Sequence, residues 1–274
     1  MSVEILILVD NVASGEALRA EHGLSLMVSG PARRVLFDAG ATPETLLANA
    51  KALGVDLSIL DEAVISHGHY DHTGGLAEVV RLRPGLKVYV HAGAFNRRWS
   101  DKPGKPLRDI SCPHSIERLY QSGAVFHSVA HPERLAGWLV VSGPIDGPRC
   151  GREAFVVRKG GEMVADGFED EIFLLAKGER GWVVVTGCCH RGLENTLRAA
   201  KSLARNQPVV AVVGGLHLRN ASGSELAETV DLLDRQGIED VYPCHCTGDK
   251  ATAFLAEKLP GHVHPVSVGS RIVL

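Results

Sequence analysis

The run SHGHYDHTGG at residues 66–75 constrains the fold of this chain more than any other stretch. It directly follows an apolar segment, and within it His67, His69 and Asp71 alternate at a spacing of two residues. An extended segment that leaves a strand places such side chains on one side, where they can bind the same metal ion. Neutral imidazoles and carboxylates are donors that suit zinc, iron or manganese. The run therefore predicts a metal site at the end of a strand.

A second metal ion is also compatible with this run. His72 stands beside Asp71 and turns toward a second ion if the chain bends into a helix at Gly74-Gly75. The alternative is a solvated histidine-rich loop, which the order of these residues between a strand and a glycine pair argues against. We therefore expect one or two ions.

The N-terminal third predicts short strands that are each bounded by Asp, Asn, Gly or Pro, a pattern typical of an antiparallel sheet. These strands are expected at residues 5–9, 24–28 and 35–37. A helix should begin at Thr42-Pro43, because Thr caps helices and Pro suits the first turn, and should end at Gly54. Its apolar face would cover the sheet.

The second half alternates strands with helices. Strands are expected at residues 182–185, 209–213 and 241–242, and helices from about residue 193, around 226–233 and around 251–255. An antiparallel half followed by strand–helix repeats predicts an α/β fold in which two sheets pack together between helical layers. The chain has 274 residues, of which 45% are hydrophobic, so it can bury one large core, and we expect a single domain over residues 1–274.

Three more histidines, His190, His217 and His245, each lie just after a predicted strand. Gly or Pro punctuates each strand end, which lets the backbone approach a ligand and aims the histidine out of the sheet. One such histidine alone could cap a helix or pack on the surface, but three equivalent placements beside the first cluster indicate metal binding or catalysis. The other histidines lack this context, so a structural role is the default for each: His22, His91, His114, His127, His131, His262 and His264.

The cysteines give a weaker signal. On an extended strand end Cys244 and Cys246 point away from His245, so we expect both thiols to pack behind it. Cys188 follows Thr186-Gly187 at a strand end, close to where a bridging ligand would lie, so thiolate ligation is an alternative to packing for this residue. Six cysteines, two of them adjacent and two flanking a histidine, do not resemble a secreted disulfide framework, which favours a reducing cytoplasm.

Residues 96–113 carry too much charge and proline for a core element, and they are too many for an ordinary connection. The segment contains Arg97, Arg98, Trp99, Lys102, Pro103, Lys105, Pro106 and Arg108. We expect a flap or cap in which Arg97 or Arg98 contacts an anionic part of the substrate. The alternative is an ordinary solvated loop.

The formal net charge of −3 gives no overall attraction to nucleic acid or to anionic membranes. No run is long enough to cross a bilayer, and the apolar residues 3–9 lack the basic leader of a signal peptide. We therefore expect a cytoplasmic protein that binds a small anionic molecule and neither nucleic acid nor membrane. The sequence leaves the oligomeric state open.

These motifs closely resemble those of the metallo-β-lactamase superfamily. The resemblance rests first on His67-x-His69-x-Asp71-His72 and on the segment LFDAG at residues 36–40. It extends over nearly the whole chain to one subgroup, the metal-dependent hydrolases related to dihydropterin-methyl-ribofuranosylaminobenzene phosphate synthase. The matching pieces lie at residues 10–11, 21–25, 66–76, 186–190, 214–218 and 243–248.

The resemblance implies an αββα four-layer sandwich with metal ions in a cleft at one edge, between the two sheets. By position, the ligands of one ion would be His67, His69 and His190, and those of the other would be Asp71, His72 and His245. Asp38 would lie behind them and orient the ligating histidines. His217 lies where phosphodiesterase and tRNA-processing relatives place a proton-donating histidine.

The chain also departs from the broader superfamily. The strand-end Thr-Gly-Asp that usually supplies a bridging carboxylate appears here as Thr186-Gly187-Cys188. Flavodiiron relatives usually carry a glutamate where this chain has His69. That difference favours zinc or manganese, although ligand type alone leaves iron open.

Three functions fit these residues. The first is hydrolysis by a metal-activated water, with Asp71 orienting the water and His217 protonating the leaving group of a small anionic or phosphate-bearing substrate. The second is a transferase, a dihydropterin-type condensing synthase in which a diphosphate departs. The third is a non-enzymatic metal-bound sensor, which a centre without an open coordination position would favour.

Overall fold

The first large sheet contains the N-terminal strands and the last strand of the chain. Its strands are β1 (Glu4–Val9), β2 (Ser25–Gly30), β3 (Arg33–Phe37), β4 (Glu62–Ile65), β5 (Lys87–Val90), β8 (Val125–Ser128) and β17 (Arg271–Val273), in the spatial order β17-β1-β2-β3-β4-β5-β8. The computed structural model describes residues 2–148, 154–205 and 207–274. The strands from β17 to β3 pair antiparallel, as predicted for the N-terminal third, and those from β3 to β8 pair parallel.

The second large sheet has six strands. They are β9 (Glu133–Ala136), β10 (Leu139–Val141), β13 (Leu174–Lys177), β14 (Trp182–Thr186), β15 (Val209–Gly214) and β16 (Asp240–Pro243), in the order β16-β15-β14-β13-β10-β9. Helices α5 (Leu193–Leu203) and α6 (Gly223–Arg235) connect β14, β15 and β16, which run parallel. The predicted alternation of strands and helices in the second half is confirmed.

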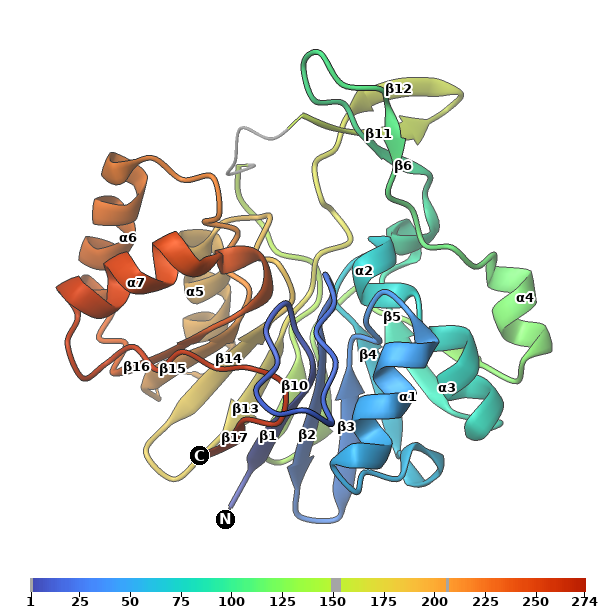
Figure 1. Ribbon diagram of the computed structural model, residues 1–274, viewed down its shortest axis with the longest axis horizontal. Helices are drawn as coiled ribbons and strands as arrows, with labels where there is room; N and C mark the ends of the chain where they lie inside the picture. Colours follow the sequence, from blue (N-terminus) through green and yellow to red (C-terminus); the bar gives the residue numbers. More distant parts are fainter. Residues whose placement is uncertain (1, 149–153, 206) are drawn as a thin grey trace.

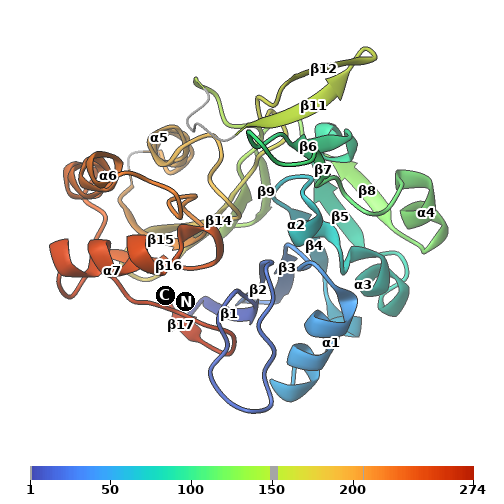
Figure 2. The same ribbon diagram turned by 45° about the horizontal axis from the view of Figure 1, so that its top comes forward.

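Helices cover the outer face of each sheet (Figures 1 and 2). Helices α1 (Pro43–Ala52), α3 (Leu76–Leu82) and α4 (Ile116–Gln121) lie on the first sheet, and α5, α6 and α7 (Asp249–Lys258) lie on the second. One apolar cluster fills the space between the sheets, and two more lie under the helices. The expected αββα sandwich is confirmed. None of the helices in the described ranges has the length and apolar character needed to cross a bilayer.

Strand β1 shows why its sequence is apolar without interruption. Ile5 and Ile7 point into the cluster between the sheets, whereas Leu6 and Leu8 point into the cluster under the helices of the first sheet. Because successive side chains alternate between faces, a strand that is buried on both faces loses the polar–apolar alternation. The helix predicted after this region is also confirmed, since Thr42 caps α1 by accepting a hydrogen bond from Thr45 N.

A third, smaller sheet stands apart from the two large ones (Figure 1). It has the order β12-β11-β6-β7, with β6 (Arg98–Ser100), β7 (Arg108–Asp109), β11 (Phe155–Lys159) and β12 (Glu162–Ala165). The basic segment 96–113 is therefore less irregular than its composition indicated, because β6 and β7 within it pair with each other and β6 also pairs with β11. The remaining short elements are α2 (Tyr70–Thr73), η1 (Leu57–Ile59), η2 (Ala92–Phe95) and η3 (His245–Thr247).

Candidate metal centre

The ends of the parallel strands bring the predicted histidines together. β14, β15 and β16 are in register at their last residues. Because parallel strands end at the same edge of a sheet, the loops that carry His190, His217 and His245 begin side by side. The loop after β4 meets them from the first sheet and contributes His69 to the lining of the same cavity, which has a volume of about 160 Å³.

His67, His69 and His190 form a first group of candidate ligands, the trihistidine group. One donor atom of each lies within 4.8 Å of those of the other two, and the ring centroids are 4.5 to 4.9 Å apart. All three side chains are buried. Burial lowers the pKa of His69 to about 3 and lowers the pKa values of His67 and His190 well below the ordinary value. The three imidazoles are therefore neutral, which is the form that binds metal.

Asp71 lies between His22 and His245, and these residues form a second group, the Asp71 group. Their donor atoms lie within 4.8 Å of one another. One carboxylate oxygen of Asp71 is 3.1 Å from His22 Nε2 and 3.6 Å from His245 Nε2. Burial raises the pKa of Asp71, but the hydrogen bond from His22 and the nearby imidazoles lower it below its ordinary value overall, so the carboxyl is ionised.

His22 differs from its predicted structural role, because its imidazole reaches the cavity and binds Asp71. This contact depends on tertiary pairing, in which Leu24 N donates a 3.1 Å hydrogen bond to the Asp71 carbonyl oxygen. The adjoining Gly23 allows the approach, since a Cβ there would lie 2.9 Å from that same oxygen. In the sequence, the only local indication that His22 reaches the site was its place, with Gly23, immediately before a predicted strand.

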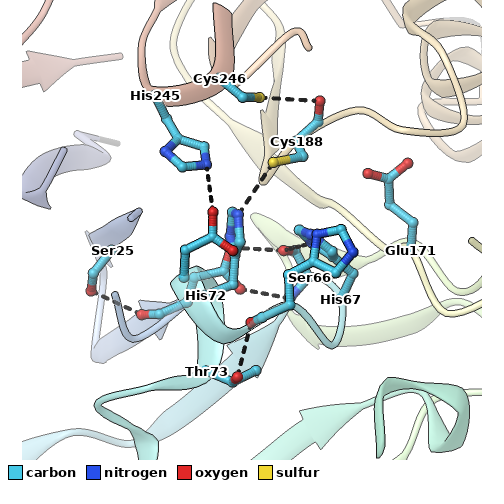
Figure 3. Close-up of polar contacts among 12 residues, drawn as sticks. Ser25, Ser66, His67, His72, Thr73, Glu171, Cys188, His245 and Cys246 are labelled. Atoms are coloured by element: carbon cyan, nitrogen blue, oxygen red, sulfur yellow. Dashed lines mark hydrogen bonds and ion pairs between the residues drawn. The ribbon is translucent and has the colours of Figure 1, made fainter. Parts of the chain in front are cut away.

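His72 occupies a different place from the one that the resemblance implied. Its Nε2 atom lies 3.2 Å from Cys188 Sγ, and its donor atom groups with Cys188 rather than with the Asp71 group (Figure 3). Its ring remains near that of His245, at a centroid distance of 4.9 Å. Burial lowers the pKa of His72, but the Asp38 carboxylate, 2.7 Å from Nδ1, raises it to about 9. His72 thus lies at the junction of the two groups.

Asp38 lies behind the histidine-rich run. Its carboxylate accepts hydrogen bonds of 2.7 Å from both Ser66 N and Ser66 Oγ, and Ser66 Oγ is 2.9 Å from His67 Nδ1 (Figure 3). Ser25 Oγ in turn donates to the carbonyl oxygen of Asp38. Hydrogen bonds to the Nδ1 atoms of imidazoles fix the orientation of the rings, and here they leave Nε2 of His67 free to face the other histidines.

Two further carboxylates hold His190 and His245, the histidines that follow strands of the second sheet. Asp10 accepts a 2.7 Å hydrogen bond from His245 N, and the side-chain oxygen of Asn11 lies 3.0 Å from His245 Nδ1. Glu171 accepts a 2.7 Å hydrogen bond from His190 N. Burial raises the pKa of Glu171 to about 7. These contacts, like those of Asp38, position the backbone or Nδ1 of a histidine and leave its Nε2 pointing elsewhere.

The thiols at the strand ends divide into two kinds. Cys188 and Cys246 line the cavity, whereas Cys244 belongs to the apolar cluster between the sheets. The prediction that Cys244 packs behind His245 is confirmed, and the same prediction for Cys246 is wrong. β16 ends at Pro243, and the chain enters η3 with a positive φ of 52° at His245, so the alternation expected of an extended segment no longer applies.

The basic segment 96–113 contributes Lys102 and Arg108 to the cavity lining, not the two arginines that were expected. The Arg97 side chain is exposed, forms an ion pair with Asp109 and lies over the ring of Trp99. Its guanidinium therefore faces solvent and its own segment. Arg219, from the loop after β15, also lines the cavity and donates a hydrogen bond to the carbonyl oxygen of His245.

Arg98 is buried, with 2% of its surface exposed. Its Nε donates to Asp166 at 2.7 Å and its Nη2 donates to Asp170 at 2.6 Å. The other carboxylate oxygen of Asp170 accepts a 2.9 Å hydrogen bond from Gly68 N, between two histidines of the trihistidine group. This pairing argues against the predicted contact between Arg98 and substrate, because carboxylates of the protein already engage the guanidinium.

His217 lines the cavity at the edge of the trihistidine group. Its ring centroid is 4.3 Å from that of His190, and its backbone has a positive φ of 55°. Its donor atom also lies within 4.8 Å of those of Cys188 and His190. The residue as a whole is partly exposed, but both of its ring nitrogens are buried.

This donor set fits a metal centre. The Nε2 atoms of His67, His69, His190 and His245 are buried without a hydrogen-bond partner in the part of the chain that the structure describes. Each unsatisfied buried polar atom costs about 1–3 kcal/mol, so four in one place require a compensating ligand. Imidazole nitrogens together with a carboxylate and thiols are the donors that bind zinc and related divalent ions.

Comparisons with known proteins give one family match and two relatives from one organism. Residues 18–128 match the metallo-beta-lactamase superfamily. Uncharacterized protein MJ0448 of Methanocaldococcus jannaschii is 34% identical over 258 residues, which cover 92% of this chain and 94% of that protein. The 7,8-dihydropterin-6-methyl-4-(beta-D-ribofuranosyl)-aminobenzene-5'-phosphate synthase of the same organism is 28% identical over 253 residues, which cover 87% of this chain and 85% of the synthase.

The fold comparison agrees. The crystal structure of Tm1679, a metal-dependent hydrolase of the beta-lactamase superfamily, superposes with a TM-score of 0.83 at 30% sequence identity. The match covers 98% of both chains.

Proposed function

Because this chain belongs to the metallo-β-lactamase superfamily, we propose that it is a metal-dependent hydrolase acting on a small anionic or phosphate-bearing substrate. The observation that carries the proposal is the set of four buried imidazole Nε2 atoms without partners among the described residues. A packed core would satisfy such atoms with protein groups, whereas a metal centre needs them unpaired.

In this proposal one ion is held by the trihistidine group. The second would be held by Asp71 and His245, with His22 bound to the Asp71 carboxylate and His72 at the junction of the two groups. Zinc suits these donors best, and manganese or iron is also compatible with them. A divalent ion held by these residues would polarise the scissile group and would lower the pKa of a bound water toward about 7.

Two side chains of the protein then act on the reacting groups. Asp71 orients the attacking water, and His217 protonates the leaving group. Asp71 is ionised and lies at the cavity surface, where its carboxylate can accept a hydrogen bond from the attacking water and fix its direction. His217 lines the same cavity from the β15 loop, and we assign it to proton transfer to the leaving group.

The charges around the cavity support an anionic substrate. Lys102 and Arg108 reach it from the basic segment, and Arg219 reaches it from the loop after β15. A cavity of about 160 Å³ is small beside the roughly 300–1,000 Å³ of typical ligand pockets. It therefore suits the reacting group, such as a phosphoryl or a carboxyl group, while the remainder of the substrate lies outside.

A condensing synthase is the second candidate, because the M. jannaschii synthase is 28% identical over most of both chains. The same cavity residues would bind different reacting molecules in a synthase. Lys102 and Arg108 would hold a departing diphosphate, and an organic nucleophile would take the place of water.

The test is activity with and without bound metal on a panel of phosphomonoesters, phosphodiesters, lactones and thioesters. We expect a chelator to abolish turnover and added zinc to restore it. His69→Ala should lose metal and activity together, whereas His127→Ala, at an exposed histidine paired with Glu133, should keep both. Turnover that survives both the chelator and His69→Ala would contradict the proposal. Activity that requires an added organic nucleophile would favour the synthase.

A further inference from the structure

Cys188 and Cys246 both line the metal cavity, although they follow different strands, β14 and β16. Cys246 Sγ is 3.5 Å from the carbonyl oxygen of Cys188 (Figure 3). Both residues are buried, with 3% and 7% of their surfaces exposed. Gly215 makes room for the second thiol, because a Cβ at that position would lie 2.6 Å from Cys246 Sγ.

The two sulfur atoms share their surroundings with His245. The donor atoms of Cys188, His245 and Cys246 all lie within 4.8 Å of one another. With Zn–S bonds of about 2.3 Å and Zn–N bonds of about 2.0–2.1 Å, the donors of a tetrahedral site are about 3.4–3.8 Å apart. Small side-chain rotations would therefore close this group around an ion.

His245 provides the independent sign of a ligand. Its side chain is 0% exposed, and its Nε2 has no hydrogen-bond partner within the described residues. The 3.6 Å separation from the Asp71 carboxylate is too long for a hydrogen bond. An unsatisfied imidazole nitrogen that shares a cavity with two thiols is a donor arrangement for a thiophilic cation.

The neighbouring cysteines show what packing alone looks like in this chain. Cys244 lies in the apolar cluster between the sheets. Cys189 Sγ lies 3.4 Å from the hydroxyl of Thr196 on α5. Neither residue lines the metal cavity, so the pairs 188/189 and 244/246 each combine one inward thiol with one packed thiol.

We propose that Cys188 and Cys246 are sulfur ligands of the metal centre and that, with His245, they make the centre selective for a thiophilic divalent ion such as Zn²⁺ over Mn²⁺. Each thiol loses its proton to solvent as its metal–sulfur bond forms. The inference rests on the proposed metal-dependent function. It goes beyond that function by adding both thiols to the ligand set and by excluding purely nitrogen and oxygen coordination.

The test is the absorption spectrum of the Co²⁺-substituted protein, compared across four single Cys→Ala variants. Thiolate ligation gives a near-ultraviolet sulfur-to-cobalt charge-transfer band. We expect Cys188→Ala and Cys246→Ala each to reduce this band by about half, and Cys189→Ala and Cys244→Ala to leave it unchanged. Zn²⁺ affinity should fall by about 10–100-fold in the first two variants, a loss comparable to those seen on disturbing metal sites, while Mn²⁺ affinity changes by less than about threefold.

Two failures would be distinguishable. Cobalt that binds without a sulfur-to-cobalt band, or a band that persists in both Cys188→Ala and Cys246→Ala, would refute the assignment of the two sulfur ligands. Either result would leave the proposed hydrolase function intact. A wild-type protein that binds no divalent ion would overturn both proposals. Circular dichroism of all four variants separates ligand loss from misfolding, and all four cysteines are buried, so the comparison is matched.

Discussion

Replacing Arg98 by Met should destabilise this protein far more than the same replacement at the adjacent Arg97. The Arg98 guanidinium lies in the interior between Asp166 and Asp170, which are 2% and 1% exposed. Its removal would leave two buried carboxylates without their cation. Arg97 pairs with Asp109 at the surface, where 62% of the Arg97 side chain and 42% of the Asp109 side chain are exposed.

The burial of each ion pair determines how much free energy of unfolding is lost when its arginine is replaced. Removing one partner of a buried ion pair costs about 3–5 kcal/mol, because the remaining charge is uncompensated. Breaking an exposed pair costs about 0–1 kcal/mol, because water solvates both charges and salt screens them. A total stability of roughly 5–15 kcal/mol means that Arg98→Met should remove a large share of the free energy of unfolding. The metal loop should loosen as well, because Asp170 also holds Gly68 N.

Urea denaturation of the two metal-free single variants measures the difference. We expect a loss of about 3–5 kcal/mol for Arg98→Met and under about 1 kcal/mol for Arg97→Met. Adding Asp166→Asn and Asp170→Asn to Arg98→Met should recover part of the loss, since both buried charges are then removed. Equal destabilisation by the two arginine variants, or no recovery in the triple variant, would refute this reasoning.

Three further predictions concern the site. His217→Ala should retain its metal and lose roughly 10²–10⁴-fold in kcat. The loss should be smallest for substrates whose leaving group needs no proton. If this variant lost metal, His217 would be a metal ligand instead. Gly68→Ala should weaken metal binding, measured by calorimetry, because its Cβ would lie 1.8 Å from a carbonyl oxygen, whereas Gly223→Ala meets open space and should bind normally. Arg108→Ala should raise KM for an anionic substrate more than it lowers kcat. Lys105→Ala, outside the cavity lining, should change neither constant. If the two variants had the same kinetic constants, Arg108 would be a solvated cation.

The layers of the fold were predictable because their signals are local. Thr42 and Pro43 begin α1 as expected, since capping depends on adjacent residues. The apolar runs that became β14 and β15 were recognisable from composition, and their parallel arrangement brings His190 and His217 to one edge. Spacing alone also predicted that His67 and His69 would share a side. These features require no knowledge of tertiary contacts.

The direction of several side chains was not predictable from the sequence. Asp38, His217 and His245 adopt positive φ values of 60°, 55° and 52°, which non-glycine residues seldom do and which cost of order 1–3 kcal/mol each. Such backbone conformations turn Cys246 into the cavity, against the alternation expected of a strand. Arg98 was misjudged for a related reason, because its carboxylate partners lie far along the chain and composition only shows that it is charged.

The most direct test of the account is the metal content of the purified protein, because every proposed role depends on the buried imidazoles binding an ion. Elemental analysis should find one or two equivalents of a divalent metal, with zinc foremost, in the wild-type chain. His69→Ala and His190→Ala should lose at least one equivalent, and His127→Ala should match the wild type. Wild-type protein that retains no metal after reconstitution with zinc, or equal metal content in all three variants, would contradict the central claim.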